Sequence, residues 1–223
     1  NDDFTTASIL IRDQWNGIPK APKTQILGVN LPMFGDKYGL GFNLKHNEVG
    51  IFSNTSLHVS YAYKIRLSDE AMFSLGVDAS GRNRKADFTD PALVASQGIE
   101  NDPSIPKTNQ SHNLFNLGSG VYLNGKRFFV GASVPKLIKN NLDFDNNAKV
   151  SSEVRHLFMM GGVDYPINKQ VLLKTQTLIK LAENSPFDAE LNVTTVLDDK
   201  YSGGITYRFG GGDGDVAESI DVI

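Results

Sequence analysis

His58, Ser60 and Asp78 are the first candidates for chemistry in this sequence, because their types could form a hydrolase site. A serine activated by a histidine, which a carboxylate orients, can attack an acyl group. His58 and Ser60 are two residues apart in an alternating segment, and residues so spaced are neighbours on the face of any strand. No nucleophile-elbow glycine pattern surrounds Ser60. We therefore interpret the three as space-filling polar residues and predict no catalytic residue.

A glycine- and aspartate-rich stretch at 210–215 has the composition of a calcium-binding loop. It lacks the ligand spacing of an EF-hand and the nonapeptide period of calcium-binding repeats, and Glu218 and Asp221 do not supply either. The chain contains no Cys, which excludes thiolate metal sites and disulfide bonds. We interpret the stretch as an external loop, and we predict neither a metal nor a cofactor for the chain.

Residues 12–24 form the segment whose composition best suits a binding site. The segment holds the only Trp, two Pro and the cationic side chains of Arg12, Lys20 and Lys23. Proline restricts the loop, so less conformational entropy is lost when it is held in one shape. Trp beside Arg and Pro is also typical of interface hot spots. The alternative is a Trp anchored at a membrane interface on a rigid hairpin. The candidate partner-contact residues are Arg12, Gln14, Trp15, Gly17, Pro19, Lys20, Ala21, Pro22 and Lys23.

The segment from Arg84 to Ser111 is longer than an ordinary connection and contains Pro91, Pro103 and Pro106. Two interpretations remain open for it. It is either a surface loop or a loop that binds a partner or plugs the interior of the protein.

Composition excludes several classes of protein. The chain has 223 residues, with 22 Lys+Arg against 25 Asp+Glu, a net charge of -3 and a pI of about 5.8. A nucleic-acid-binding protein usually has a basic face or a pI above about 9. Mean hydropathy is -0.24, and no run approaches the roughly 18 apolar residues that a membrane-spanning helix needs. Transmembrane barrels are not excluded, since their apolar residues occupy every second position.

Apolar and polar residues alternate along most of the chain, which indicates β-strands. The clearest case is 56–67, where Leu57, Val59, Tyr61 and Tyr63 alternate with small or polar residues. No long segment has helical periodicity, and a single helical turn near Pro135–Ile138 is the best helix candidate. We predict strands at 4–14, 24–33, 38–46, 55–67, 72–82, 113–123, 127–134, 153–165, 171–182, 189–197, 201–209 and from 216 onward.

Tight and long connections are expected to alternate without a break. The tight turns fall near 34–37, 68–70, 124–126, 167–169 and 198–200, and the long connections at 15–23, 47–54, 83–112, 135–152, 183–188 and 210–215. Short periplasmic turns on one rim and longer external loops on the other are typical of an outer-membrane barrel, whereas a Greek-key sandwich has no reason to keep this order. Aromatic residues near strand ends and few charges on the polar faces also favour a membrane barrel over a soluble one.

A family resemblance is carried by the same binding candidate. Arg12, Gln14, Trp15, Gly17 and the run 21–24 reproduce an R-x-Q-W-x-G-x-x-x-A-P-K-T stretch, and similar pieces follow in order at 39–42, 60–65, 75–76, 129–137, 161–165 and 203–208. The chain thereby resembles the PorP/SprF family of outer-membrane proteins, found with the type IX secretion system of Bacteroidota. The family's opening N-P-A-Y-A-G stretch and its closing G-S-H-E-type motif are absent here. We therefore expect one barrel domain over 1–223, an all-β, up-and-down antiparallel transmembrane barrel with about 12 strands in this chain and 14 in the full protein.

The resemblance implies a non-enzymatic, integral outer-membrane component of type IX secretion and gliding motility in a Gram-negative, Bacteroidota-type bacterium. Such a component would dock or anchor a secreted or envelope partner. The partners expected are other type IX secretion or gliding components, a secreted adhesin and outer-membrane lipid, with no nucleic acid and no small-molecule substrate. The alternative is a porin for small solutes, and an outer-membrane hydrolase ranks third. The family has no established catalytic residues, so none is transferred.

Overall fold

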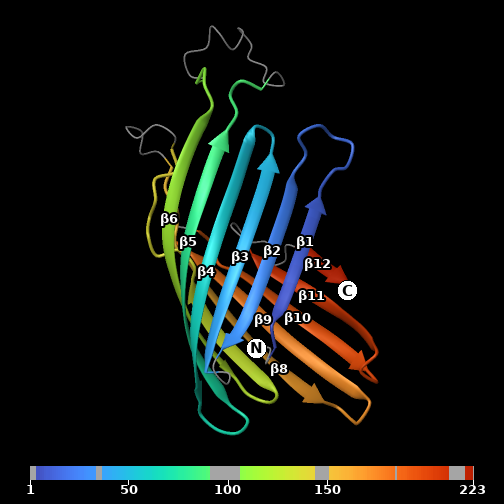
Figure 1. The fold of residues 1–223 in the computed structure, drawn as a ribbon. Coiled ribbons are helices and arrows are strands. Elements are labelled where there is room, and N and C mark those ends of the chain that lie inside the picture. Colours follow the sequence, from blue (N-terminus) through green and yellow to red (C-terminus); the bar gives the residue numbers. More distant parts are fainter. Residues whose placement is uncertain are drawn as a thin grey trace. The chain divides into compact units, whose positions relative to one another are not determined.

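The computed structural model describes residues 4–33, 37–90, 106–143, 151–183, 185–210 and 219–222. Within these ranges the chain is all-β and contains no helix. The strands are β1 Thr6–Asp13, β2 Lys23–Met33, β3 Tyr38–Val49, β4 Phe52–Arg66, β5 Met72–Ala86, β6 Gln110–Asn124, β7 Phe128–Val134, β8 His156–Pro166, β9 Val171–Ala182, β10 Asp188–Leu197, β11 Tyr201–Gly210 and β12 Ser219–Val222 (Figure 1). In the described part of the chain, no helix has the length and apolar character needed to cross a membrane.

Each strand neighbours the next one in sequence, giving a 12-stranded sheet of order β1 to β12. The pairs whose register is defined are all antiparallel, as in β1–β2, where Thr6 lies opposite Asn30 and Asp13 opposite Lys23. The predicted all-β, up-and-down antiparallel architecture is confirmed. The sheet is not closed within the described residues, and its topology is consistent with a β-barrel.

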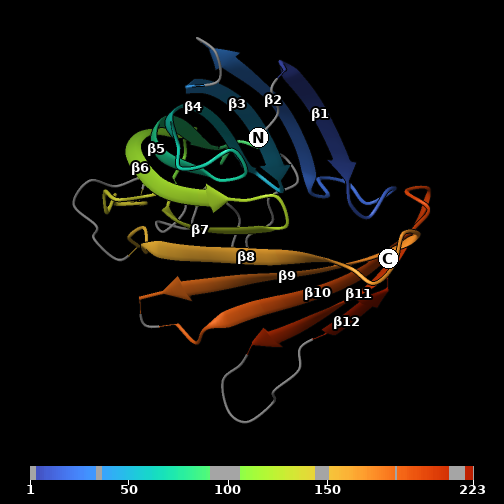
Figure 2. The ribbon, with the colours of Figure 1, turned by 90° about the horizontal axis from the view of Figure 1, so that it is seen from below.

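The chain falls into two compact units. The first unit comprises Asn1–Tyr61, Asp78–Leu117 and Ile138–Glu153, and the second comprises Ala62–Val77, Gly118–Leu137 and Val154–Ile223. The first unit contains β1 to β3 and the candidate binding loop between β1 and β2. In the second unit, β8 to β12 lie side by side in sequence order, as Figure 2 shows.

Burial is inverted relative to a water-soluble protein. Along β4 the apolar side chains of Leu57, Val59, Tyr61 and Tyr63 are exposed, whereas the small and polar residues between them are more buried. Among described residues, the buried hydrophobic side chains are Ala86 and Leu114, while the buried polar ones are Lys64, Ser74, Ser80, Asp90, Asn116, Glu153 and Thr206. An apolar band that faces outward and a polar face that is covered are characteristic of strands in a bilayer.

The predicted long connection at 47–54 is wrong. β3 continues to Val49 and β4 begins at Phe52, so only Gly50 and Ile51 join the two strands. Gly50 has a φ of 58°, the positive value that tight hairpin turns require at their first central position. The prediction failed because polar residues, His46 and Glu48 in β3 and Ser53 and Thr55 in β4, occupy positions that are apolar elsewhere in these strands, so the backbone pairs without apolar alternation.

Two further predictions around the β7–β8 connection are wrong. Residues 135–138 form an irregular bend rather than a helical turn, because the Asn116 side chain, not a helical carbonyl, binds the Ile138 amide. The strand predicted from 153 begins at His156, since Glu153 belongs to a separate pairing described below. The strand predicted from 216 is described only at Ser219–Val222. The turn at 34–36, residues 91–105 of the long loop and 211–215 of the glycine-rich stretch lie outside the described residues.

Candidate functional site

The connection between β1 and β2 is held in one shape by its own backbone. The Gln14 amide donates to the Pro22 carbonyl oxygen over 3.0 Å, which closes the base of the loop. Inside it, the Ile18 amide donates to the Trp15 carbonyl over 3.0 Å, and the Ala21 amide donates to Ile18 over 3.3 Å. Trp15 has a φ of 53°, a left-handed conformation that is uncommon for a large side chain. The hydrogen bonds and the left-handed conformation of Trp15 hold the loop in one shape and fix the position of its tip.

Two neighbouring connections brace the same loop. The Gly50 amide of the β3–β4 turn donates to the Lys20 carbonyl oxygen over 3.0 Å. The Lys20 ammonium group forms an ion pair with Asp90, which follows β5 and is almost fully buried. The hydrogen bond to Asp90 is the main reason that the pKa of Lys20 is raised above its usual 10.5. Lys20 is therefore charged at neutral pH and engaged within the protein.

The cationic character predicted for the loop is offset locally. Arg12 and Lys23 lie in β1 and β2 rather than in the connection itself. In the strand register Lys23 is opposite Asp13 on one side and Glu48 on the other. With Lys20 paired to Asp90, the loop presents little uncompensated positive charge.

The tip of the loop is apolar and exposed. Trp15 retains 67% of its accessible surface and Ile18 retains 58%. Ile18 was not among the predicted contact residues, although its position between Gly17 and Pro19 in the turn is a signal that could have identified it. Of the predicted residues, Trp15, Gly17, Pro19 and Lys20 are exposed in the connection, Gln14, Ala21 and Pro22 form its half-buried base, and Arg12 and Lys23 lie in the strands.

His58, Ser60 and Asp78 do meet, but not as a hydrolase site. The Ser60 hydroxyl donates to Asp78 Oδ2 over 2.8 Å, and His58 Nδ1 lies 3.1 Å from Asp78 Oδ1. In a catalytic triad the histidine stands between the serine and the carboxylate. Here the carboxylate stands between the other two, so the serine has no base aligned with it through this contact.

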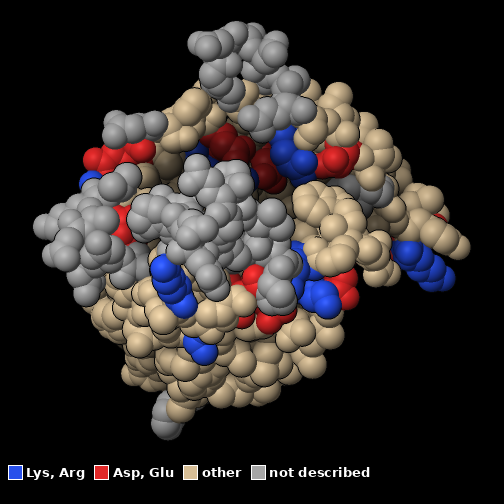
Figure 3. Space-filling view, turned by 90° about the horizontal axis from the view of Figure 1, so that it is seen from above, with Lys and Arg blue, Asp and Glu red and all other residues tan. Residues whose placement is uncertain are grey.

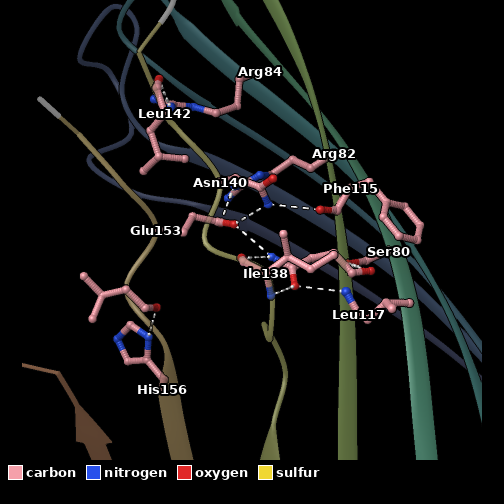
Figure 4. Close-up of polar contacts among 12 residues, drawn as sticks. Ser80, Arg82, Arg84, Phe115, Leu117, Ile138, Asn140, Leu142, Glu153 and His156 are labelled. Carbon is pink, nitrogen blue, oxygen red and sulfur yellow. Dashed lines mark hydrogen bonds and ion pairs between the residues drawn. The ribbon is translucent and has the colours of Figure 1, made fainter. Parts of the chain in front are cut away.

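A buried polar cluster that the sequence did not predict lies on the polar face of β5 and β6 (Figure 4). Its centre is Glu153, which is only 5% exposed. Glu153 forms an ion pair with Arg82 of β5 and accepts hydrogen bonds from Asn116 of β6 over 3.1 Å and from Asn140 over 3.0 Å. A buried carboxylate is stable when charge and hydrogen-bond donors compensate it in this way.

Asn116 connects the cluster to the chain that follows β7. Its amide nitrogen donates to the Ile138 carbonyl oxygen over 2.8 Å, and its amide oxygen accepts from the Ile138 amide over 3.0 Å. The same residue is 4% exposed. The sequence does not predict that Asn116 contacts Ile138 and Glu153, because the segment 135–152 shows no apolar periodicity.

Two basic residues of the second unit are likewise paired with acidic ones. In the second unit Lys180 lies 2.6 Å from Glu190 and 3.0 Å from Asp188, and Arg208 lies 2.8 Å from Asp221. Figure 3 shows acidic and basic side chains next to one another on the face viewed from above. Among the described residues, no group of three or more His, Asp or Glu is arranged to hold a metal ion.

The exposed apolar strands and the braced loop agree with the comparison to protein families, in which residues 1–222 match the family of the type IX secretion system membrane protein PorP/SprF. The chain belongs to the PorP/SprF family. No curated protein matches it. Membership of PorP/SprF implies involvement in type IX secretion and interaction with other components of that system. PorP/SprF proteins are membrane components of a secretion system and are not known as enzymes.

Proposed function

We propose that this PorP/SprF protein is a single β-barrel domain, integral to the outer membrane of a Gram-negative, Bacteroidota-type bacterium. In this proposal it docks or anchors a secreted or envelope partner of type IX secretion, such as an adhesin of gliding motility. The barrel contacts outer-membrane lipid and carries out no reaction itself. The β1–β2 connection is the docking element.

The inverted burial of the strands supports the membrane placement. Exposed Leu57, Val59 and Tyr61 on β4 would be costly in water as a continuous band, whereas lipid tails accommodate them without penalty. The covered polar face in turn suits the interior of a barrel.

The observation that carries the docking role is the exposed pair Trp15 and Ile18 on a pre-organised loop. Association costs free energy when side chains and loops become ordered, and a loop that is already fixed avoids much of this cost. Trp is also enriched among residues that dominate binding energy. A loop tip of this kind is suited to inserting into an apolar pocket of a partner.

The geometry around Asp78 supports a non-enzymatic role. Ser60 and His58 both bind the carboxylate, so they are well suited to filling the polar face and poorly arranged for acyl transfer. The remaining alternative for the tip is that Trp15 anchors the loop in lipid headgroups. The two roles differ in what loss of the tip does to insertion.

The test is co-purification of type IX components with a Trp15→Ala/Ile18→Ala double variant. A matched control is Tyr165→Ala/Ile167→Ala, with Tyr165 near the end of β8 and Ile167 in the β8–β9 turn, where the two side chains are 64% and 56% exposed. We expect the loop variant to insert normally, as judged by heat-modifiable migration, and to lose its partner, while the control retains it. Retention of the partner by the loop variant, or its failure to insert, would contradict the docking role.

A further inference from the structure

The chain between β7 and β8 contains a short hairpin that the strand pattern did not predict. We call residues 138–143 and 151–153 the inner hairpin. Asn141 forms an antiparallel bridge with Ser152, and the Leu142 amide donates to the Ser151 carbonyl over 2.8 Å. The Glu153 amide donates to the Asn140 carbonyl, also over 2.8 Å. The described part of the hairpin is therefore a paired element.

The inner hairpin lies over the polar face of β5 and β6. Arg82 and Arg84 are two residues apart on β5, as are Leu114 and Asn116 on β6, so each pair points to one side of its strand. Arg84 donates to the Leu142 carbonyl over 2.7 Å, and Arg82 pairs with Glu153. In Figure 4 the Phe115 ring points away from the cluster, which marks the opposite, apolar face.

The hairpin does more than replace a missing strand partner. β7 ends at Val134 and pairs with β6 only over Ser119–Asn124, so the first half of β6 has no partner from β7. The Asn140 side-chain amide partly replaces β7 here, because it donates to the Phe115 carbonyl oxygen of β6 over 3.0 Å. A substitute strand would bond to β6 alone, however. The contacts of Glu153 and Leu142 with Arg82 and Arg84 extend across β6 to β5, which places the hairpin over the face.

An ion pair and hydrogen bonds join the inner hairpin to the sheet. Its bonds to the sheet run from Arg82, Arg84, His112 and Asn116, and His112 Nδ1 lies 2.9 Å from the Asp143 carbonyl oxygen. Ile138 at its start keeps 38% of its surface exposed. Water can replace the partners of such hydrogen bonds, whereas it cannot replace buried apolar contacts. The hairpin is therefore attached in a defined geometry, and it can be released when water replaces its hydrogen-bond partners.

We propose that the inner hairpin is a releasable cover over a path for small hydrophilic solutes, with Glu153 as its latch. The inference rests on the proposed outer-membrane barrel, because only then does the polar face of β5 and β6 line the barrel interior. In the latched state the hairpin obstructs that face. Release of Glu153 from Arg82, Asn116 and Asn140 weakens the attachment to the bonds that Arg84, His112 and Asn116 make with the hairpin backbone, and detachment then exposes a polar surface along which ions and small solutes pass.

The test is single-channel conductance of the full chain in planar bilayers, with KCl as the permeant salt. We expect the unmodified protein to be mostly closed and Glu153→Ala to be open about tenfold more of the time, which corresponds to about 1.4 kcal/mol. Because Glu153→Ala leaves Arg82 without its ion pair, the Asn116→Ala/Asn140→Ala variant serves as a second test that leaves the ion pair in place. It should also open more often than the unmodified protein.

The matched control is Glu190→Ala. Glu190 is a carboxylate of β10 in the second unit, where it is paired to Lys180 and its Oε1 atom lies 3.8 Å from Arg208 Nε, whereas the inner hairpin belongs to the first unit. Its removal should leave the fraction of time open unchanged.

Equal open fractions in the unmodified protein, Glu153→Ala and Asn116→Ala/Asn140→Ala would overturn the proposal, as would an unmodified protein that is already open. If Glu153→Ala fails to insert, the asparagine variant decides. The docking proposal can be tested separately from this one, because Trp15→Ala/Ile18→Ala should have the same conductance as the unmodified protein whether or not it retains its partner. An unmodified chain that does not insert into bilayers would refute the outer-membrane placement, and this proposal with it.

Discussion

Gly118 occupies a position where β6 and the chain after β7 approach too closely for a side chain. A Cβ atom at Gly118 would lie 2.8 Å from the Pro135 carbonyl oxygen and 3.1 Å from its Cα atom. Both are backbone atoms, so the contact cannot be relieved by a change of rotamer. Gly81 of β5 offers a comparison, since a Cβ atom there meets nothing within 4 Å.

We expect Gly118→Ala to lower the free energy of unfolding by about 1–3 kcal/mol, the usual cost of forcing atoms into a filled site. Gly81→Ala should be neutral or slightly stabilising, because alanine reduces the freedom of the unfolded chain. Urea unfolding of both variants in the same detergent measures the difference. Equal stability of the two alanine variants would show that Pro135 does not approach β6 as described.

Residue contacts within and between adjacent strands were predictable, whereas those through loops were not. The period of two placed His58 and Ser60 on one face, and neighbouring strands brought Asp78 to them. Glu153 and Asn116 are 37 positions apart and meet only because the chain after β7 turns onto the polar face. The sequence holds no period or motif there, so the cluster could not be predicted from it.

At the scale of elements, the exposed apolar face of β4 is the strongest indication that the strands contact lipid. Val59 is near the middle of the strand and is 38% exposed, on the same face as Leu57 and Tyr61. Charged substitutions on a lipid face are most costly at the membrane midplane.

We expect Val59→Arg to destabilise the folded protein in lipid by about 2–4 kcal/mol. Ile167→Arg is the control, because Ile167 is also an exposed apolar residue but lies in a turn outside the strands. Urea titration of the two variants in liposomes, followed by heat-modifiable migration, gives the comparison. A Val59→Arg protein as stable as Ile167→Arg would exclude lipid contact of this face.

Strand positions were predictable because one face of each strand is apolar and the other polar. The prediction failed where that contrast is lost, as around 47–54, where β3 continues to Val49 and β4 begins at Phe52 although polar residues replace the apolar ones on the outer face next to the turn. Likewise β5 extends to Ala86 and β6 begins at Gln110, beyond the predicted limits of 82 and 113. Backbone pairing continues where the apolar alternation is interrupted by polar residues, and apolar periodicity cannot detect it.

At the scale of the whole molecule, the net charge of -3 conceals a pattern of local compensation. Lys20 pairs with Asp90, Lys126 with Glu70 and Arg82 with Glu153. The Lys126 ammonium group also holds the pKa of Glu70 below its usual 4.5. Charges paired in this way contribute little to a long-range field that could attract a partner of opposite sign.

We therefore expect retention of the type IX partner to depend on the apolar tip and not on salt. Raising the salt concentration from about 0.1 M to about 0.5 M screens contacts between exposed charges but does not weaken apolar ones. The fraction of partner that co-purifies should stay constant over this range. It should also stay constant from about pH 6 to about pH 9, because Lys20 stays charged throughout this interval. The raised pKa of Lys20 means that its ion pair with Asp90 is complete below 10.5 and is lost only as the pH rises through the higher, folded-state pKa.

Asp90→Asn supplies the contrast, because it frees the Lys20 charge at the loop and should introduce a salt dependence that the unmodified protein lacks. If high salt instead released the partner from the unmodified protein, the contact would be ionic, and Arg12 and Lys23 rather than Trp15 and Ile18 would be the residues that hold it.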